Sequence, residues 1–460
     1  MPFHQDVSLH PDFEAAVRAT HSRPALPVAL PSIVDHAVIL VGETGPSQDH
    51  ARILSAIEHL KNFAIEKDAH GEVVATDGES QIKWERHTEF IALTQITPNK
   101  QQHATELATA RFHAIVAELA PKEHRDENAQ QGASLFSRTR VNVDLAPEGD
   151  DLRTRSVPAT DKLSGAFDPN ERNLLQVIMS GGAIRLSTTL HHTSEGLIAY
   201  QAELKRTDGQ AASPNRVGRY VQRVIEVESY RLLAYLAVPM MQELGSRVSE
   251  LEARVNAIAQ RATQDPKPKE EAAILTELTM VSAELQSIGS ASEFRFAASL
   301  AYAAIVDERI ASLREERIEG YQRLSTAVKR RLDPAMRSAK ALLARQEQIA
   351  GRIGYVTDLL RTRVDLSLQD QNAKVLRSID DRANAQLRLQ RAVEGLSVVA
   401  ITYYMLGILS YLVDGAFGGP FGLTSNWVQA ALVIPVVALV FFGVRQARIR
   451  AEAADEKREE

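Results

Sequence analysis

Few side chains in this sequence are placed to do chemistry. If the segment KWERHTEF (residues 83–90) is one extended strand, Glu85, His87 and Glu89 lie on the same face of it, because side chains alternate along a β-strand. Carboxylate oxygens and an imidazole nitrogen are ligands that a divalent cation accepts. A polar strand face that makes cross-strand pairs accounts for the same pattern, and we favour that interpretation.

Other catalytic and ligand-binding patterns are missing from the sequence. His191 and His192 are neighbours that would point to opposite faces of a strand, so one metal ion cannot take both. The absence of cysteine excludes disulfides, thiolate metal sites and cysteine nucleophiles, and it fits a reducing compartment. We find no phosphate loop, no Gly-x-Ser-x-Gly, no His-Glu-x-x-His and no dinucleotide fingerprint. The sequence therefore predicts no enzyme activity and no cofactor.

Length and charge narrow the class of protein. A chain of 460 residues is too long for one ordinary core, so two or three structural units are expected. The 53 Lys and Arg residues against 59 Asp and Glu residues give a formal net charge of -6. Because a protein that coats nucleic acid usually needs a cationic excess, we expect no nucleic-acid partner.

The C-terminal region predicts a membrane hairpin. Between Gly395 and Val444 the only charged residue is Asp414. Residues 395–413 and 427–444 each contain 18 consecutive uncharged residues, about the length that crosses roughly 30 Å of hydrocarbon. We therefore expect two transmembrane helices joined by an external loop at 414–426. A buried hairpin in a soluble protein is the alternative.

The charges beside this hairpin predict its orientation. The loop contains no Lys or Arg, whereas both outer ends are basic, and basic residues stay on the cytoplasmic side. The arginines concerned are Arg382, Arg388, Arg391, Arg445, Arg448 and Arg450. The first ten residues also lack the pattern of a cleaved signal peptide. We expect a multi-pass protein of the bacterial inner membrane, with both termini and the 445–460 tail in the cytoplasm and the lipid bilayer as a partner.

Long helices are expected before the hairpin. Apolar residues recur at steps of four or seven from residue 356 to 387, which predicts one continuous stalk helix over 334–394 that packs against other helices. The preceding region, 215–333, predicts helices over 215–261, 269–287 and 290–331 in an antiparallel layer. Pro239 should kink or interrupt the first of them.

Residues 1–214 predict a cytoplasmic α/β domain. Its strands are expected at 35–41, 83–94, 176–180, 183–190 and 196–204, and its helices at 47–63 and 100–119. Part of the polar segment 126–172 is expected to be an ordered loop or hairpin rather than core. The predicted fold class is thus an α+β N-terminal domain, then long antiparallel helices, then a two-helix transmembrane hairpin.

Several sequence blocks carry a family resemblance. The chain resembles, over nearly its whole length, a bacterial family of predicted membrane-anchored proteins with a domain of unknown function. This resemblance brings no activity with it. The blocks are HSRP (21–24), KWERHTEF (83–90), GGAIRLSTTLHHTSEGL (181–197), NRVGRYVQRVIEVESYRLLAYLAVP (215–239) and QRAVEGLSVVAITYYMLGILSYL (390–412).

The order of the predicted elements is also similar to that of CorA-type magnesium transporters, in which five subunits surround a pore lined by the first span. That similarity implies a divalent cation as a partner and side chains of the first span facing a lumen. The residues it implies are Ser397, Thr402, Tyr403, Ser410 and Tyr411, with Glu394 and Asp414 at the two mouths. The Gly-Met-Asn signature that ends the first span in those transporters is absent here.

Each of these residues has a plainer interpretation. A hydroxyl in a membrane helix, as at Ser397 or Thr402, often bonds the carbonyl four residues earlier or a neighbouring helix. Glu394 forms an ion pair with Arg391 in the plainer interpretation, and Asp414 is a hydrated loop residue. Two hypotheses follow: a homo-oligomeric protein that conducts or senses cations, or a non-conducting tethered scaffold or sensor that recruits a partner through its helices.

Overall fold

The structure is a computed structural model of the whole chain, and it divides into two compact units. One comprises residues 1–266 and 272–354, and the other comprises residues 267–271 and 355–460. The structure describes residues 24–41, 45–60, 62–69, 71–99, 102–120, 133–149, 151–153, 174–193, 196–206, 212–264, 266–417, 430–431 and 433–446.

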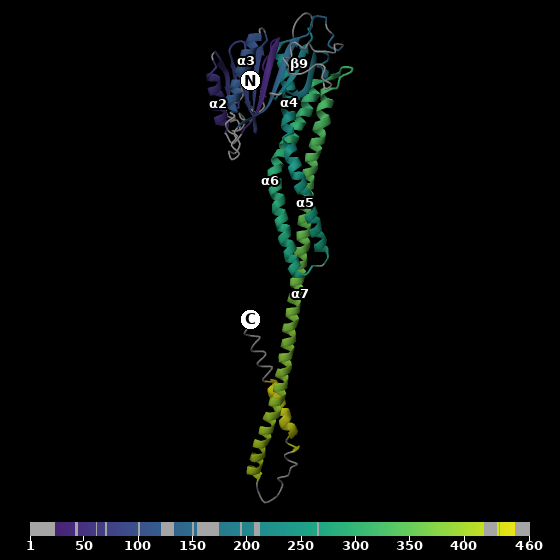
Figure 1. Cartoon of the computed structure of the whole chain (residues 1–460). Coiled ribbons are helices and arrows are strands. Elements are labelled where there is room, and N and C mark those ends of the chain that lie inside the picture. The colour runs from purple at the N-terminus through teal and green to yellow at the C-terminus, as the bar shows by residue number, and fades with distance from the viewer. Residues whose placement is uncertain are drawn as a thin grey trace, which may run out of the picture. The chain divides into compact units, whose positions relative to one another are not determined.

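The first unit is built on one mixed β-sheet (Figure 1). The strands are β1 (Ser32–Leu40), β2 (Ala64–Ala69), β3 (Glu72–Thr76), β4 (Gln81–Arg86), β5 (Phe90–Pro98), β6 (Ser134–Leu145), β7 (Leu175–Met179), β8 (Ile184–His192), β9 (Leu197–Leu204) and β10 (Glu316–Arg317). Their order is β10-β7-β8-β9-β6-β1-β5-β4-β3-β2. Among these ladders only β6 and β9 pair in parallel, so the sheet is mixed.

Six labelled helices lie in the described residues, besides the shorter apolar helix Val433–Gln446. They are α2 (Pro46–Glu58), α3 (Gln102–Leu119), α4 (Pro214–Ala234), α5 (Ala237–Thr263), α6 (Pro268–Leu313) and α7 (Leu324–Phe417). An N-terminal domain of mixed sheet and helices, followed by long helices, agrees with this part of the predicted fold class.

The two sheet faces have separate cores. On one face, Ile82, Trp84 and Leu93 pack with Phe112 of α3 and Ile53 of α2. The opposite face of the sheet packs against α4, where valines and isoleucines at helical spacing join a cluster that continues into α6 and the start of α7. Side chains alternate along each strand, so one strand supplies both cores.

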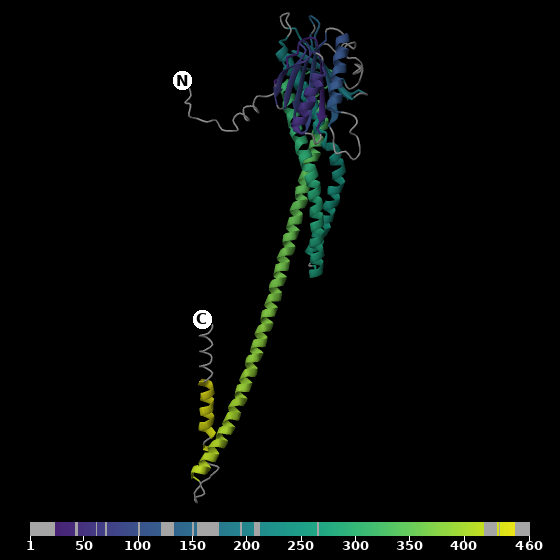
Figure 2. The same cartoon turned by 90° about the vertical axis from the view of Figure 1, so that its left-hand side faces the viewer.

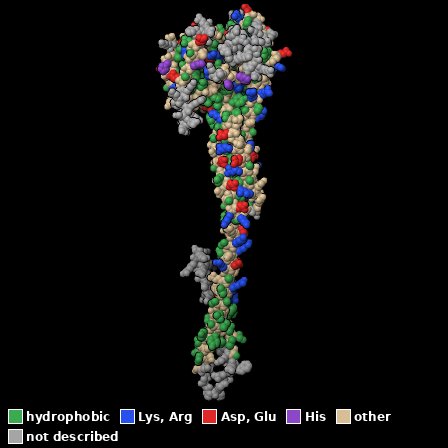
Figure 3. Space-filling model, in the orientation of Figure 1, with side chains coloured by type: hydrophobic (Ala, Val, Ile, Leu, Met, Phe, Trp, Pro, Cys, Tyr) green, Lys and Arg blue, Asp and Glu red, His purple; other side chains and the backbone are tan. Residues whose placement is uncertain are grey.

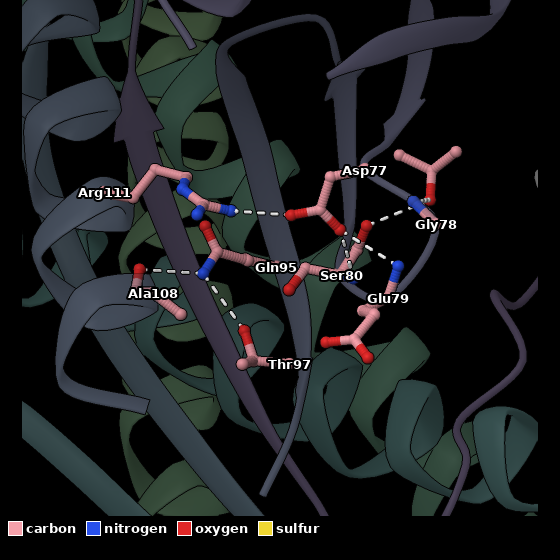
Figure 4. Close-up of polar contacts among 9 residues, drawn as sticks. Asp77, Gly78, Glu79, Ser80, Gln95, Thr97, Ala108 and Arg111 are labelled. Carbon is pink, nitrogen blue, oxygen red and sulfur yellow. Dashed lines mark hydrogen bonds and ion pairs between the residues drawn. The ribbon is translucent and has the colours of Figure 1, made fainter. Parts of the chain in front are cut away.

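A tight turn between β3 and β4 is attached to α3 (Figure 4). The Asp77 carboxylate accepts hydrogen bonds from the backbone N–H groups of Glu79 at 3.0 Å and Ser80 at 2.6 Å, and its other oxygen accepts one from Arg111 at 3.1 Å. Beside it, the buried amide of Gln95 donates to Thr97 at 3.2 Å and to the Ala108 carbonyl at 2.8 Å. These contacts hold α3 over the β3 to β5 strands.

The helices α5, α6 and residues 324–354 of α7 form the predicted antiparallel layer. Ion pairs join α5 to α6, including Arg254 with Glu284 at 2.9 Å. Arg345 of α7 pairs with Glu252 of α5 at 2.6 Å. The break between α4 and α5 falls at residues 235–236, and Pro239 lies in the first turn of α5, where a missing N–H costs nothing. The predicted interruption is confirmed.

Several predicted boundaries differ from the structure. The predicted strand 83–94 is two strands, because the chain turns at residues 87–89 between β4 and β5. Strands β2 and β3 have no counterpart among the predicted strands. The largest difference is β6, which lies within the polar segment 126–172. No strand was predicted there, yet β6 lies inside the sheet between β9 and β1.

The helix boundaries also differ. Helix α6 runs without a break through Gly289 and ends at Leu313, so the predicted separate helices 269–287 and 290–331 do not exist. Helix α7 begins at Leu324 and contains Pro334 ten residues later. The strand β10, which pairs with β7, separates α6 from α7, and with only two residues it is too short for a sequence pattern to reveal.

The second unit contains residues 355–417 of α7 and a shorter apolar helix, Val433–Gln446. These two helices lie side by side in both views (Figures 1 and 2). Val436 and Val440 are buried, as is Thr402 of α7. Hydrophobic side chains gather on the surface of this part of the unit (Figure 3).

Candidate functional site

The predicted Glu85, His87 and Glu89 face is not a metal site in this structure. Glu85 pairs with Lys83 at 3.0 Å, the His87 ring stacks on Phe90 with ring centroids 4.1 Å apart, and Glu89 binds Arg295 of α6 at 2.6 Å. The turn at 87–89 breaks the alternation that would have aligned them. The favoured interpretation was a polar strand face that makes cross-strand pairs, whereas the Glu85–Lys83 pair lies within the single strand β4.

The neighbouring histidines do not form a metal site either. His191 and His192 are both exposed at the end of β8, where the register with β9 is irregular. Within the ranges that the structure describes, no group of three or more His, Asp and Glu side chains could hold a metal ion.

The residues suggested as pore-lining lie on α7. The Ser397 hydroxyl donates to the Val393 carbonyl at 2.9 Å, which is the bond to the carbonyl four residues earlier. Thr402 is buried, and its Oγ1 has no hydrogen-bond partner in the described part of the chain. Tyr403 and Tyr411 are exposed by 74% and 83%. These side chains therefore point in different directions from a single α7 helix and do not converge within one chain.

The residues at the two predicted mouths are less informative. Glu394, at one predicted mouth, lies on α7 and makes polar contacts, as does Ser410, which was suggested as pore-lining. Asp414 lies in the last turn of α7, but its side chain is outside the described part of the structure, as is most of the predicted loop 414–426.

Helix α7 also contains a candidate membrane span. Of the described helices, it alone is long and apolar enough to cross a membrane by length and composition, and only 6% of its most apolar 18-residue window is buried. The second apolar helix, Val433–Gln446, is shorter than a full span.

A large cleft lies in the first unit between the sheet and α4. Its volume is about 1120 Å³, and it is lined by β1 to β5, by α4 and by residues 24–28. Apolar side chains such as Ile96, Phe90 and Ile225 form part of its lining. Ligand pockets usually combine such apolar walls with a few polar groups.

The floor of the cleft carries an in-register polar row. His36, Thr94 and Lys83 are direct neighbours across β1, β5 and β4. The His36 ring nitrogens lie 2.9 Å from the Thr94 hydroxyl and 3.1 Å from the Ser229 hydroxyl of α4. Burial, and then the positive charge of Lys83, lower the pKa of His36 to about 3. The imidazole is therefore neutral at physiological pH.

Charged groups continue this floor. The buried ammonium of Lys83 donates to the Pro24 carbonyl at 3.0 Å and lies 3.0 Å from a Glu85 oxygen. Glu72 binds Lys67 through one oxygen. Its other oxygen, Oε1, is buried with no hydrogen-bond partner in the described residues and lies 3.7 Å from Lys83. A buried carboxylate oxygen without a hydrogen bond lowers the stability of the folded state unless a donor reaches it.

The wall formed by α4 is more basic than the floor. Arg219 and Arg223 line the cleft one helical turn apart, followed by Glu226, which pairs with Arg309 of α6. Arg223 has one long hydrogen bond, 3.5 Å to the Ser312 carbonyl. Arg219 is exposed and makes no ion pair with the described residues. Two guanidinium groups on this wall are thus largely free to bind an anion.

Residues 24–28 form a strap beside the cleft. The Pro24 carbonyl accepts from Lys83 of the sheet, and the Val28 N–H donates to the Pro214 carbonyl of α4 at 3.0 Å. A Cβ on Gly218 would lie 1.9 Å from the Leu26 carbonyl oxygen, so only glycine lets the strap approach the helix.

Sequence reasoning missed this cleft entirely. Its walls come from segments more than two hundred residues apart, and no compact motif joins them. The sequence signals that could have pointed to it are local: Lys83 inside a strand, and two arginines spaced i, i+4 in the block NRVGRYVQR. A buried lysine is rare unless it is paired, as Lys83 is here.

The structure thus shows a mixed-sheet domain with a cleft between the sheet and α4, followed along the chain by long helices, of which α7 contains the apolar window. The chain belongs to the family described as Protein of unknown function (DUF3422), whose model matches residues 8–451. The predicted membership of a family of unknown function, over nearly the whole chain, is confirmed. No curated protein matches the chain significantly.

Proposed function

We propose that this protein is anchored in a membrane by a two-helix hairpin, residues 395–413 and 427–444, and holds its sheet domain in the cytoplasm. The observation that supports the proposal is the exposed apolar window of α7. Burying one large apolar side chain is worth about 1.5–3 kcal/mol, so an exposed helix of such residues favours transfer into lipid. The second apolar helix, Val433–Gln446, lies beside it and would complete the hairpin.

The proposed orientation places both termini on the cytoplasmic side of the bacterial inner membrane. Arg382, Arg388 and Arg391 precede the first apolar segment, and Arg445 follows the second. Such a distribution of basic residues favours cytoplasmic flanks.

Membrane fractionation tests the anchor. The full chain is expected in the membrane pellet after extraction with alkaline carbonate, and in the supernatant only after addition of detergent. A matched variant with Ile401→Arg and Ile408→Arg is expected to lose this association, because each arginine at mid-span costs about 2.5–3.5 kcal/mol. A wild-type chain that stays soluble without detergent would overturn the proposal.

Within this class, we favour a non-conducting tethered sensor or scaffold. The large cleft of the first unit supports a domain that binds a ligand. Cation conduction is the second candidate. It is supported by the uninterrupted α7, which continues into the first apolar segment as in the CorA-type arrangement. Two helices cannot enclose a lumen, so conduction requires several copies.

Flux measurements separate these two candidates. Purified full-length protein in liposomes is expected to give no Mg²⁺, K⁺ or Na⁺ flux above empty liposomes at any applied membrane potential. Flux that falls in a Glu394→Gln variant would instead favour the conducting homo-oligomer, with Ser397, Thr402, Tyr403, Ser410 and Tyr411 as residues to test next.

A homo-oligomer is part of the proposal. The predicted apolar stripe of α7 is buried at Val356 and Leu360 but exposed at Leu368, Val375 and Ile379. Copies anchored in the same membrane with the same orientation would present this stripe at the same height. A second copy of the chain is therefore the occupant that we propose for it.

A further inference from the structure

We propose that the cleft between the sheet and α4 binds a small organic anion with an apolar body and a hydrogen-bond donor. The anionic group is bound by Arg219 and Arg223, and the donor by Oε1 of Glu72. This inference concerns the first unit alone and goes beyond the membrane anchor, because it assigns a ligand class to the cytoplasmic domain.

The charge of the lining selects an anion. On the floor, Lys67 and Lys83 are balanced by Glu72 and Glu85. On the α4 side, the Glu226 carboxylate is already taken by Arg309, which leaves Arg219 and Arg223 without a carboxylate partner among the described residues. Paired guanidinium groups one turn apart suit a carboxylate, sulfonate or phosphate.

The buried carboxylate of Glu72 selects the donor. Glu72 is 8% exposed, it lines the cleft, and no described group donates a hydrogen bond to its Oε1. A hydrogen bond to a buried carboxylate oxygen favours the binding of a ligand whose N–H or O–H group reaches that oxygen. A ligand with an amino, amide or hydroxyl group at this end therefore fits better than one without it.

The remaining lining selects the apolar body. Val34, Ile96 and Ala92 of the strands face the cleft, as do Val221 and Ile225 of α4. A volume of about 1120 Å³ is larger than a single inorganic anion needs and fits a ligand of one or more rings.

Three probes that differ by one group each test the proposal on the full chain in lipid nanodiscs. They are an aminonaphthalenesulfonate, the naphthalenesulfonate that lacks the amino group, and the naphthylamine that lacks the sulfonate. We expect saturable binding of the first probe, weaker binding of the second, and the weakest binding of the third. Empty nanodiscs measure how much of each probe partitions into the lipid, and this background is subtracted from the binding signal.

Variants then locate the binding site. The double variant Arg219→Gln and Arg223→Gln is expected to weaken the aminonaphthalenesulfonate about tenfold or more. Arg216→Gln, on the same helix but outside the cleft, removes one positive charge as a control and is expected to bind as the wild type does. Glu72→Leu is expected to abolish the preference for the amino group while the sulfonate preference persists.

Each outcome supports or overturns the proposed site. Because Arg219 is exposed and Arg223 half-buried, their substitution does not threaten the fold, and melting temperature checks this. Equal affinities in the double variant and the Arg216→Gln control would overturn the proposal. So would the absence of saturable binding by the wild type, or tighter binding of the naphthylamine than of the sulfonates.

Discussion

At the scale of single residues, His36 links the stability of the sheet domain to pH. Its ring is held between two hydroxyls, Thr94 and Ser229, that can each donate or accept, so the neutral imidazole is fully satisfied. The protonated ring would lie in the same buried place near the Lys83 ammonium, and no carboxylate of the described residues hydrogen-bonds to it. Burial therefore opposes protonation of the folded state.

The direction of the pH effect follows from this pKa. The unfolded chain takes up a proton on His36 below about pH 6.5, whereas the folded chain does so only near pH 3, so acidification favours the unfolded state. Between pH 6.5 and pH 5 the wild type is expected to lose roughly 2 kcal/mol through this residue, and a His36→Gln variant should not. Urea unfolding of both proteins across this pH range measures the difference. Parallel stability curves would contradict this prediction.

The Asp77 turn gives a second prediction at this scale. Asp77→Ala removes two bonds to turn N–H groups and one to Arg111, and it is expected to lower the free energy of unfolding by about 1–3 kcal/mol. Asp77→Asn keeps an oxygen for the turn but loses the charge opposite Arg111, so it should cost less than half as much. Thermal unfolding of the three proteins ranks them, and an equal loss in both variants would show that the turn bonds contribute little.

At the scale of elements, the docking of α4 onto the sheet depends on a buried polar contact as well as on the apolar core. The Tyr200 hydroxyl of β9 donates to Glu228 at 2.6 Å, and Glu228 also pairs with Arg231 one turn later. Burial and then the Glu228 charge raise the pKa of Tyr200 well above 10, so the phenol remains a donor. This contact fixes the rotation of α4 and thus the cleft wall.

Loss of Glu228 should therefore be costly. Glu228→Ala leaves Arg231 without its buried partner, and the expected loss is about 3–5 kcal/mol of unfolding free energy. Glu250→Ala, an exposed glutamate on α5, is the control and should change stability by less than about 0.5 kcal/mol. Similar urea midpoints for the two variants would mean that the contact does not hold α4.

The contact between the strap and α4 makes a separate prediction. Gly218→Ala places a methyl group 1.9 Å from the Leu26 carbonyl oxygen, so the strap must move, at an expected cost of about 1–3 kcal/mol. At Gly245 in α5, an added methyl group would meet no described atom within 4 Å, so Gly245→Ala should instead stabilise by about 0.5–1 kcal/mol. Opposite shifts in melting temperature are expected, and shifts of the same sign would contradict the close approach.

Helices can be predicted from this sequence better than strands, for a physical reason. A helix repeats its pattern over many turns, so the stalk is evident even though α7 begins ten residues before the predicted start. Strand β6 also alternates, with Val141 and Val143 between polar residues, but its polar side is buried as well. Arg140 binds Asp35 at 2.7 Å and Asn142 is only 4% exposed, so polarity there does not mean contact with solvent.

At the scale of the whole molecule, the candidate site could not be predicted because the fold itself creates it. The cleft gathers the strap, strands β1 to β5 and α4, and each contributes residues that look ordinary in their local sequence. The apolar C-terminal segments are the reverse case, since their composition alone indicates a membrane hairpin. The composition of a short segment is thus enough to predict the proposed anchor. The cleft forms only when the fold brings together segments that are far apart in the sequence.

The exposed stripe of α7 leads to a prediction about association between copies. Leu368, Val375 and Ile379 are each more than half exposed, a state that is costly for a helix face in water unless another surface covers it. Ile379→Asp places a charge in the middle of this stripe and should dissociate the oligomer. Ser378→Asp adds the same charge at the neighbouring exposed position, about 100° around the helix, and should leave the oligomer intact. The mass of each protein in nanodiscs, measured at several protein concentrations, is the readout. A wild-type chain that is monomeric throughout would remove both the oligomer and any conducting pore, because a pore requires helices from more than one copy.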